Sequence, residues 1–394
     1  MGHLPASATK HPIAGHRIFF PVATVFAIVV LPASLSAMLG VTPLFPGLAS
    51  PAGHAHELLF GFALAVVAGN QLGPRPMRTL VVLLASWLLA RIAFIAAPTG
   101  LVSVASNVLF PALLVYHVAP RLLGSAKKWR NQALPAALLA ICASAAALTL
   151  TIAWPSEQRV ASRDAIAIAV ALFALLLLFM GGRLIAPTVA GQIYRQGGNL
   201  EARVQPRIEG ALIVAMALGV VALVVEALTA QLALPADVAG LALVVAGVLA
   251  AIRIGRWRLW RLRGRPDLLC LAAGYAWLAV GLVLFGVTHA QRPESFVAET
   301  LAIHVITIGS LGTLTLNVMA MTRLLTLRRP PASTRWPLYG TLLLAVAVVL
   351  RTLGASATRP SLLVAAALCW SAAFAMLLPV LSLRKLEPAS VRAA

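Results

Sequence analysis

Apolar segments long enough to cross a lipid bilayer recur along the whole chain, and they leave few folds open to it. A helix needs about 20 apolar residues to span the hydrocarbon core of a bilayer. Only 11% of the residues are charged, against roughly 25% in a soluble domain. The sequence therefore predicts an all-α polytopic membrane protein, with a single integral-membrane domain over residues 1–394 and about twelve transmembrane helices. The expected helices are 18–40, 57–72, 77–97, 100–120, 131–153, 164–187, 209–231, 236–253, 267–288, 299–322, 335–354 and 360–383.

The basic residues predict how this bundle sits in the membrane. With the N-terminus inside, twenty-five of the 31 Lys and Arg residues fall on the inner side and six on the outer side. Cytoplasmic loops carry such an excess, so we expect both termini in the cytoplasm, with residues 1–17 and 384–394 as its two end segments. The net charge of +20 follows from this topology and does not call for a nucleic-acid partner. The first apolar run is a full span, so no cleavable signal peptide is expected.

Ionisable side chains at one predicted depth are the best clue to function, because such groups are costly in a membrane and are functional by default. Neutral imidazole is also a common ligand for haem iron and copper. Four histidines, three glutamates and one arginine fall in the outer half of the bundle. They are His54, His56, Glu57, Arg91, Glu226, His289, Glu299 and His304.

Helix geometry limits what the cluster at the mouth of the second span can do. At about 100° per residue, His54 and Glu57 share a face, whereas His56 points about 200° away from His54. Either His54 lies in the preceding loop, or the two histidines serve different partners. On this geometry we expect Glu57 to accept the ring N–H of His54 and to fix its tautomer, as carboxylates do around metal sites.

Simpler interpretations exist for each of these residues. His54 and His56 could be an interfacial pair in contact with lipid headgroups, and Glu57 could cap its helix. His304 could be a buried histidine bonded to a neighbouring carbonyl. For His289 a solvated loop is the favoured interpretation.

The inner side carries a weaker set of candidates. Arg183 follows two glycines near an inner helix end, where it could pair with a haem propionate or a lipid phosphate, or anchor the helix. The polar connection 188–208 could dock a partner or line a quinone entrance. The chain has no Cys-x-x-Cys-His sequence for covalent c-type haem, and its three cysteines lie in apolar runs as core residues.

Several motifs together resemble the NnrS family. The run His54-Ala55-His56-Glu57-Leu58-Leu59-Phe60-Gly61-Phe62 is similar to its first signature, and residues 302–323, from Ala302-Ile303-His304 to Met321-Thr322-Arg323, are similar to its second. Residues 181–185 and 274–278 also fit, as does Arg17 before Phe19-Phe20. Leu58 replaces the usual methionine, Ile18 a proline, and no histidine follows Arg323.

The resemblance implies a twelve-helix protein of the bacterial inner membrane that carries haem, of b type here, and copper, and that responds to nitric oxide. It places the haem and its surroundings at His54, His56, His304, Arg91 and Arg183, and metal ligation at His54, His56, His304 and His289. Nitric oxide would be bound or reduced, with quinol as the electron donor and Glu57, Glu226 and Glu299 as proton carriers. The competing hypotheses are a cofactor-free solute transporter and an electron-transfer or metal-centre assembly subunit.

Overall fold

The computed structural model describes residues 12–42, 44–125, 129–155, 161–229, 236–291, 296–356 and 359–384. The predicted cytoplasmic segments 1–17 and 384–394 therefore lie largely outside the described residues. Within the described residues, the two strands are β1 (Ile13–Ala14) and β2 (Pro74–Arg75), which pair antiparallel. The α-helices are α1 (His16–Met38), α2 (Pro51–His56), α3 (Leu64–Gln71), α4 (Met77–Ala96), α5 (Leu101–Ser125), α6 (Trp129–Ala153), α7 (Ser162–Met180), α8 (Ala186–Arg195), α9 (Pro206–Leu228), α10 (Ala236–Gly255), α11 (Pro266–Ala290), α12 (Phe296–His304), α13 (Thr313–Thr326), α14 (Trp336–Ser356), α15 (Pro360–Ala375) and α16 (Leu378–Ser382).

Shorter helical segments complete the described chain. Three are π-helices that join longer helices: η2 (Glu57–Ala63), η3 (Gly181–Ile185) and η6 (Val305–Gly312). Four are 3₁₀ turns: η1 (Pro46–Leu48), η4 (Glu201–Arg203), η5 (Leu259–Leu262) and η7 (Pro331–Ser333).

Twelve continuous helical stretches in the described chain are long and apolar enough to cross a membrane, which confirms the predicted fold class. Three of them are longer by five or more residues than the sequence indicated: Pro51–Gln71, Ser162–Arg195 and Val297–Thr326. The span Pro51–Gln71 begins before His54 because Ser50 caps it, accepting a hydrogen bond from the Gly53 amide at 3.0 Å. Part of the predicted polar connection 188–208 is helical, since α8 extends to Arg195 and η4 covers Glu201–Arg203.

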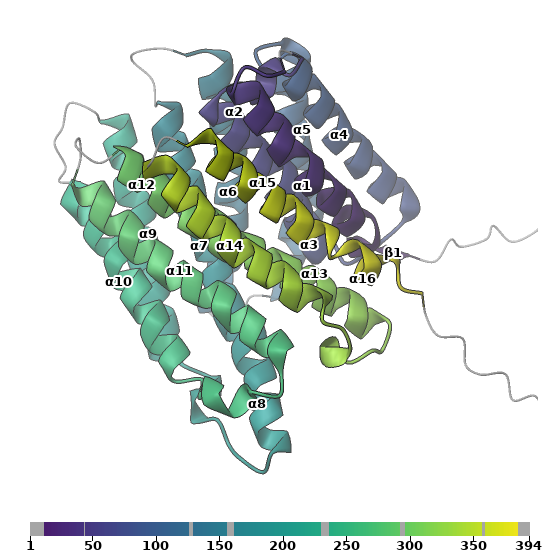
Figure 1. The fold of residues 1–394 in the computed structure, drawn as a ribbon, viewed down its shortest axis with the longest axis vertical. Helices are drawn as coiled ribbons and strands as arrows, with labels where there is room; N and C mark the ends of the chain where they lie inside the picture. Colours follow the sequence, from purple (N-terminus) through teal and green to yellow (C-terminus); the bar gives the residue numbers. More distant parts are fainter. Residues whose placement is uncertain are drawn as a thin grey trace, which may run out of the picture.

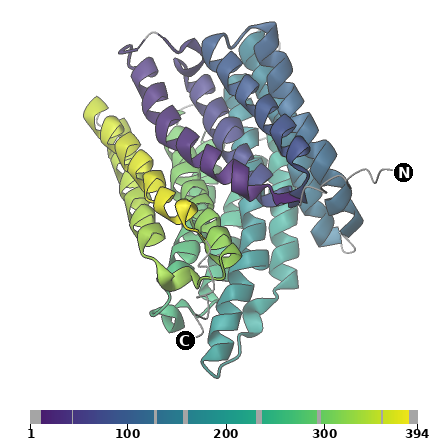
Figure 2. The same ribbon diagram turned by 90° about the vertical axis from the view of Figure 1, so that its right-hand side faces the viewer.

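The helices form one bundle in which the first and the last spans are neighbours (Figures 1 and 2). Trp370 Nε1 of α15 donates to the Ala27 carbonyl of α1 at 3.1 Å, and Ser371 Oγ donates to the Ile28 carbonyl at 2.8 Å. In Figure 1, α2 and α12 lie toward the top and α8 lies at the bottom. We call the end that holds α2 and α12 the histidine end, and the end rich in arginines, predicted to be cytoplasmic, the basic end.

The three spans that contain π-helices are the most deeply buried of the twelve. Their most apolar windows are 72%, 82% and 78% buried inside the protein, against 33–61% for the other nine. They therefore form the centre of the bundle, and the remaining spans separate them from lipid. The candidate motifs around His54, Arg183 and His304 all lie on these central spans.

Candidate functional site

His54 and His304 come together at the histidine end although 250 positions separate them in the chain. Their rings are nearly parallel, with an interplanar angle of 24° and centroids 6.3 Å apart. His54 lies within α2, not in the preceding loop, and His304 ends α12. We call these two residues the histidine pair.

Hydrogen bonds to the protein fix one nitrogen of each ring in the histidine pair. His304 Nδ1 lies 2.7 Å from the Thr300 carbonyl, which can only accept, so Nδ1 carries the proton. His54 Nδ1 lies 3.1 Å from Ser34 Oγ, and the Ser34 hydroxyl donates to the Leu48 carbonyl, which leaves its oxygen able to accept. Among the described residues, neither Nε2 has a hydrogen-bond partner. This pattern, with Nδ1 anchored and Nε2 available, is the one that metal-binding histidines show.

His56 faces the other side of α2 and belongs to a separate, fully buried group. Its Nδ1 lies 3.0 Å from Glu57 Oε1 and its Nε2 lies 3.0 Å from Thr149 Oγ1. Its ring also stacks on Phe94, with centroids 4.0 Å apart. Both ring nitrogens are thus engaged with protein groups, and one of these hydrogen bonds would have to break before His56 could bind a metal.

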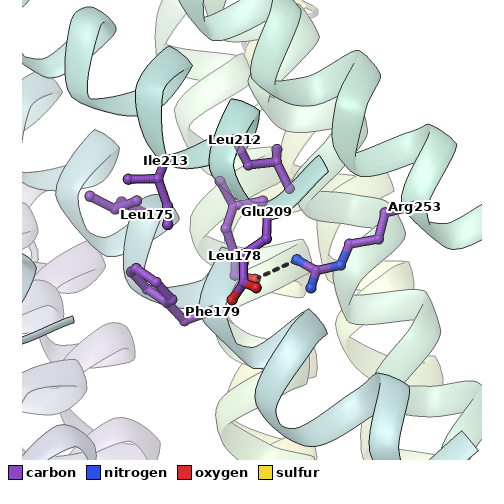
Figure 3. Close-up of a pocket in the computed structure, with 7 residues that line it drawn as sticks. All are labelled: Leu175, Leu178, Phe179, Glu209, Leu212, Ile213 and Arg253. Carbon is purple, nitrogen blue, oxygen red and sulfur yellow. Dashed lines mark hydrogen bonds between the residues drawn. The ribbon is translucent and has the colours of Figure 1, made fainter. Parts of the chain in front are cut away.

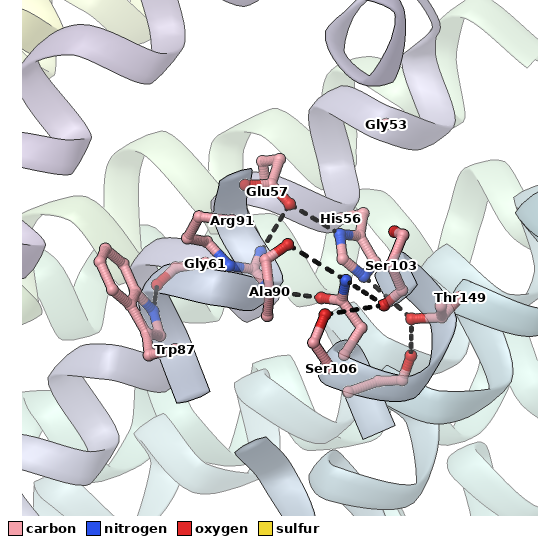
Figure 4. A network of polar contacts seen from close by, with 12 residues as sticks. Gly53, His56, Glu57, Gly61, Trp87, Ala90, Arg91, Ser103, Ser106 and Thr149 are labelled. Atoms are coloured by element: carbon pink, nitrogen blue, oxygen red, sulfur yellow. Dashed lines mark hydrogen bonds and ion pairs between the residues drawn. The ribbon is translucent and has the colours of Figure 1, made fainter. Parts of the chain in front are cut away.

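Arg91 completes this group, which we call the Glu57 network (Figure 4). Its Nη1 donates to Glu57 Oε1 at 2.5 Å, and its Nη2 donates to Asn107 Oδ1. Asn107 in turn donates to the Ser103 carbonyl at 2.9 Å. Glu57 is 0% and Arg91 4% exposed, so the network holds a buried ion pair in the interior of the protein.

The prediction that Glu57 accepts the ring N–H of His54 was wrong. Glu57 binds His56 and Arg91, whereas the Nδ1 atom of His54 is bound to Ser34 of α1. The α-helical winding continues as far as Glu57, but at 100° per residue two positions three apart still differ by about 60°, and His56 and Arg91 lie within hydrogen-bond distance of the carboxylate. The interpretation of His54 and His56 as an interfacial pair was also wrong for His56, which is 0% exposed.

A second buried group surrounds His289 at the same end. His289 Nδ1 lies 3.0 Å from Glu299 Oε1 of α12, and its Nε2 lies 2.9 Å from Glu226 Oε2 of α9. Glu299 also accepts a hydrogen bond from Arg163 of α7. His289 lies inside α11 and is 0% exposed, so the favoured interpretation of a solvated loop was wrong. We call these four residues the His289 cluster.

Arg183 lies at the basic end, far from the other predicted site residues. Twenty positions separate it from Arg163 of the His289 cluster on one continuous span, which corresponds to about 30 Å along the helix. Its Nη2 donates to Asn131 Oδ1 at 3.0 Å. It therefore cannot contact a group held by the histidine pair.

A family model described as NnrS protein matches residues 13–382, nearly the whole chain. The chain belongs to the NnrS family. No curated protein sequence matches it. The motifs at residues 54–62, 181–185 and 302–323 lie on the three central spans, each of which contains one of the three π-helices. The motif at residues 274–278 lies on α11, and Arg17 with Phe19-Phe20 lies on α1.

In this NnrS-family chain the π-helices change which backbone and side-chain groups meet. The Gly61 carbonyl in η2 accepts a hydrogen bond from Trp87 Nε1 at 2.9 Å. A side chain at Gly61 would collide with Phe26, since an added Cβ would lie 2.6 Å from its ring, and would also crowd Arg91 at 3.0 Å. Such segments occur frequently at functional sites, and here Gly61 of η2 leaves room for the Arg91 side chain.

The small residues after His304 serve helix packing and not an open cradle. A Cβ added at Gly309 would lie 2.8 Å from the Trp277 ring, and one added at Gly312 would lie 2.8 Å from the Trp370 ring. These glycines therefore allow close packing of neighbouring helices.

Several residues of these groups escaped the sequence reasoning. Ser34, Asn107 and Thr149 have no sequence signal, because a hydroxyl or amide in an apolar helix usually bonds to its own backbone. Arg163 and Arg351 did carry a sequence signal, since each is a charged residue within an apolar span or at its end. Arg351 of α14 lies close enough to act electrostatically on both rings of the histidine pair.

Proposed function

We propose that this NnrS-family membrane protein binds haem through the histidine pair and takes part in nitric oxide detoxification. The observation that carries the proposal is the geometry of His54 and His304, whose Nδ1 atoms are anchored and whose Nε2 atoms are available. Two imidazoles that share one metal ion have ring centroids at most about 6–6.5 Å apart, because metal–nitrogen bonds are about 2.0–2.1 Å long. The separation of 6.3 Å agrees with that limit.

The number of donors favours haem over a bare metal ion. Among the described residues, no group of three or more His, Cys, Asp or Glu side chains could hold a metal ion. A protein site for a bare zinc ion usually supplies three or four ligands, whereas the haem macrocycle brings four nitrogens of its own. Two histidines therefore suit iron that is already held by a macrocycle, and the residues fit the group. Copper is proposed from the family resemblance.

Haem iron with one histidine ligand and an open coordination position binds small diatomic molecules such as nitric oxide. With both histidines of the pair on the iron no position would be open, so nitric oxide would bind there only after one of the two imidazoles leaves the iron. The protein's own contribution would be to fix both imidazoles through Ser34 and Thr300, and to keep water away by burying the central spans. Arg351 would place a positive charge near an anionic edge of the cofactor.

We further propose that the protein reduces nitric oxide. Two molecules of nitric oxide, two electrons and two protons give nitrous oxide and water, and oxidation of one quinol to quinone supplies both electrons. The His289 cluster suits proton delivery, because an imidazole between two carboxylates can take a proton at one nitrogen and release one at the other. Glu226 is 24% exposed and Glu299 2% exposed, so the pair could lead protons from the surface inward. Glu57 is the third proposed carrier, and its carboxylate is held by Arg91.

The test is a pyridine haemochrome assay with metal analysis on the purified protein and on the variants His54→Ala and His304→Ala. The matched control is His117→Ala, which removes a histidine at the basic end. We expect a haem spectrum in the parent and the control, and its loss or a clear shift in both pair variants.

A colourless parent protein would favour the transporter hypothesis. Haem content and spectrum unchanged in both pair variants would refute the assignment of the ligands. A haem protein that binds nitric oxide without turnover when supplied with quinol would favour the electron-transfer or assembly subunit.

A further inference from the structure

A pocket at the basic end contains a buried arginine that is short of partners (Figure 3). Arg253 of α10 is 3% exposed. Its Nη1 reaches the Leu178 carbonyl and the Tyr275 hydroxyl only at 3.5 Å each, the outer limit for a hydrogen bond. Its Nε has no hydrogen-bond partner among the described residues. A guanidinium with five N–H donors is therefore held inside the protein with few and long contacts.

Cationic side chains outnumber the anionic ones around this pocket. Figure 3 shows Arg253 directed toward Glu209 of α9, and Arg130 Nη1 donates to Glu209 Oε2 at 2.7 Å. Arg183 lies above the Phe179 ring, with its central carbon 5.4 Å from the ring centroid. Among the described residues at the pocket, one carboxylate thus faces three guanidinium groups. The surplus favours an anionic ligand, since charged groups in such a site require compensation.

The pocket is polar at one end and apolar at the other, along the membrane normal. α9 begins at the basic end, so Glu209 lies nearer that end than Leu212 and Ile213, and α7 likewise places Phe179 nearer to it than Leu175. Trp129, which begins α6 beside Arg130, is 56% exposed, as expected for a tryptophan at the level of the lipid headgroups. The arginines therefore lie at headgroup depth, and the apolar wall continues toward the middle of the membrane.

We propose that this pocket binds the phosphate of an anionic phospholipid from the leaflet at the basic end. Arg253 and Arg183 would donate to the phosphate oxygens, and the acyl chains would stay in the bilayer outside the pocket. Basic pockets between transmembrane helices recognise lipid headgroups in this way. The proposal does not depend on the metal centre, which lies at the opposite end of the bundle.

The double glycine before Arg183 gains a role in this site. A Cβ added at Gly182 would lie 2.3 Å from Arg253 Nη2, and one added at Gly181 would lie 2.5 Å from the Tyr275 ring. Only glycine at these positions lets Arg253 and Tyr275 occupy the space beside η3. The Gly-Gly-Arg sequence thus gives room to one arginine of the site and supplies another.

The experiment is native mass spectrometry of the full-length protein, titrated with phosphatidylglycerol and, separately, with phosphatidylcholine. The variants are Arg253→Gln and Arg183→Gln, and the control is Arg256→Gln, which changes an exposed arginine at the same end. We expect the parent and the control to bind phosphatidylglycerol preferentially, and each pocket variant to bind it about tenfold more weakly. Arg183 is exposed, so its variant reports on the site even if Arg253→Gln misfolds.

Three outcomes would overturn the proposal. Phosphatidylglycerol affinity that is unchanged in Arg183→Gln and in a folded Arg253→Gln would show that the lipid binds elsewhere. Equal affinity for both lipids would remove the anionic headgroup as the determinant. Displacement of the lipid by millimolar inorganic phosphate, with no requirement for an acyl chain, would assign the pocket to a free anion.

Discussion

Arg91 offers the sharpest test of how the bundle holds its buried charges. Its guanidinium is 4% exposed and lies 2.5 Å from a Glu57 carboxylate that is 0% exposed. Replacing Arg91 by methionine keeps much of the side-chain volume but leaves the carboxylate with only His56 as a partner. Breaking a buried pair by removing one partner costs about 3–5 kcal/mol, so we expect Arg91→Met to lower the free energy of unfolding by that amount.

A double-mutant cycle separates the ion pair from the effect of each single change. Glu57→Gln removes the negative charge and leaves Arg91 with Asn107. In the combined variant neither charge remains, so its loss of stability should be smaller than the sum of the two single losses, by at least about 2 kcal/mol. The measurement is reversible unfolding in mixed micelles, followed by tryptophan fluorescence. The matched control is Arg78→Met on the same helix, because Arg78 is exposed and its loss should change stability by about 0.5 kcal/mol or less.

The reasoning fails on either of two results. Equal losses of stability in Arg91→Met and Arg78→Met would mean that burial of the pair does not matter. Strict additivity in the cycle would mean that Glu57 and Arg91 do not stabilise one another, despite their 2.5 Å contact.

Three further predictions follow from single contacts. Ser34→Ala removes the acceptor of the His54 Nδ1 proton and should shift the haem spectrum, whereas Glu57→Gln should leave it unchanged because Glu57 does not contact His54. His289→Gln should keep the haem content but slow nitric oxide turnover roughly tenfold or more, measured with a nitric oxide electrode; unchanged turnover would remove the His289 cluster from the proton path. Gly309→Ala forces a Cβ to within 2.8 Å of Trp277 and should destabilise by about 1–3 kcal/mol, while Gly191→Ala, with open space around it, should be neutral or stabilising in the same unfolding assay.

The fold was predictable because hydropathy averages over some 20 residues, and all twelve spans survive that average. The ends of the spans that carry the histidine pair were not predictable in the same way. Pro51–Gln71 and Val297–Thr326 have the lowest mean hydropathy of the twelve, 1.3 and 1.6, because each carries buried polar groups. A prediction from hydropathy places the end of a membrane helix at such polar groups. In the structure, neighbouring helices pair them, and the helix continues past His54 and His56.

The candidate site was predictable in its members but not in its pairings. The common depth of the titratable groups follows from topology, and the structure does bring His54 to His304 and His289 to Glu226 and Glu299. Which group meets which depends on the order of helices around the bundle, and no single helix encodes that order. The partners of His54 come from α1 and α12, and those of His56 and Glu57 from α4 and α6.

The contacts of Glu57 show why the local prediction failed while the global one held. An α-helical repeat places residues three apart on one face, and this led to the pairing of Glu57 with His54. The winding is still α-helical as far as Glu57, whose amide bonds to the Gly53 carbonyl, but each side chain has its own nearer partners: Ser34 for His54, and His56 with Arg91 for Glu57. Within four residues, His54 thus contributes to the histidine pair and Glu57 to the ion pair with Arg91. Two chemically different sites can thus share one short stretch of helix, because its successive side chains meet partners from different neighbouring helices.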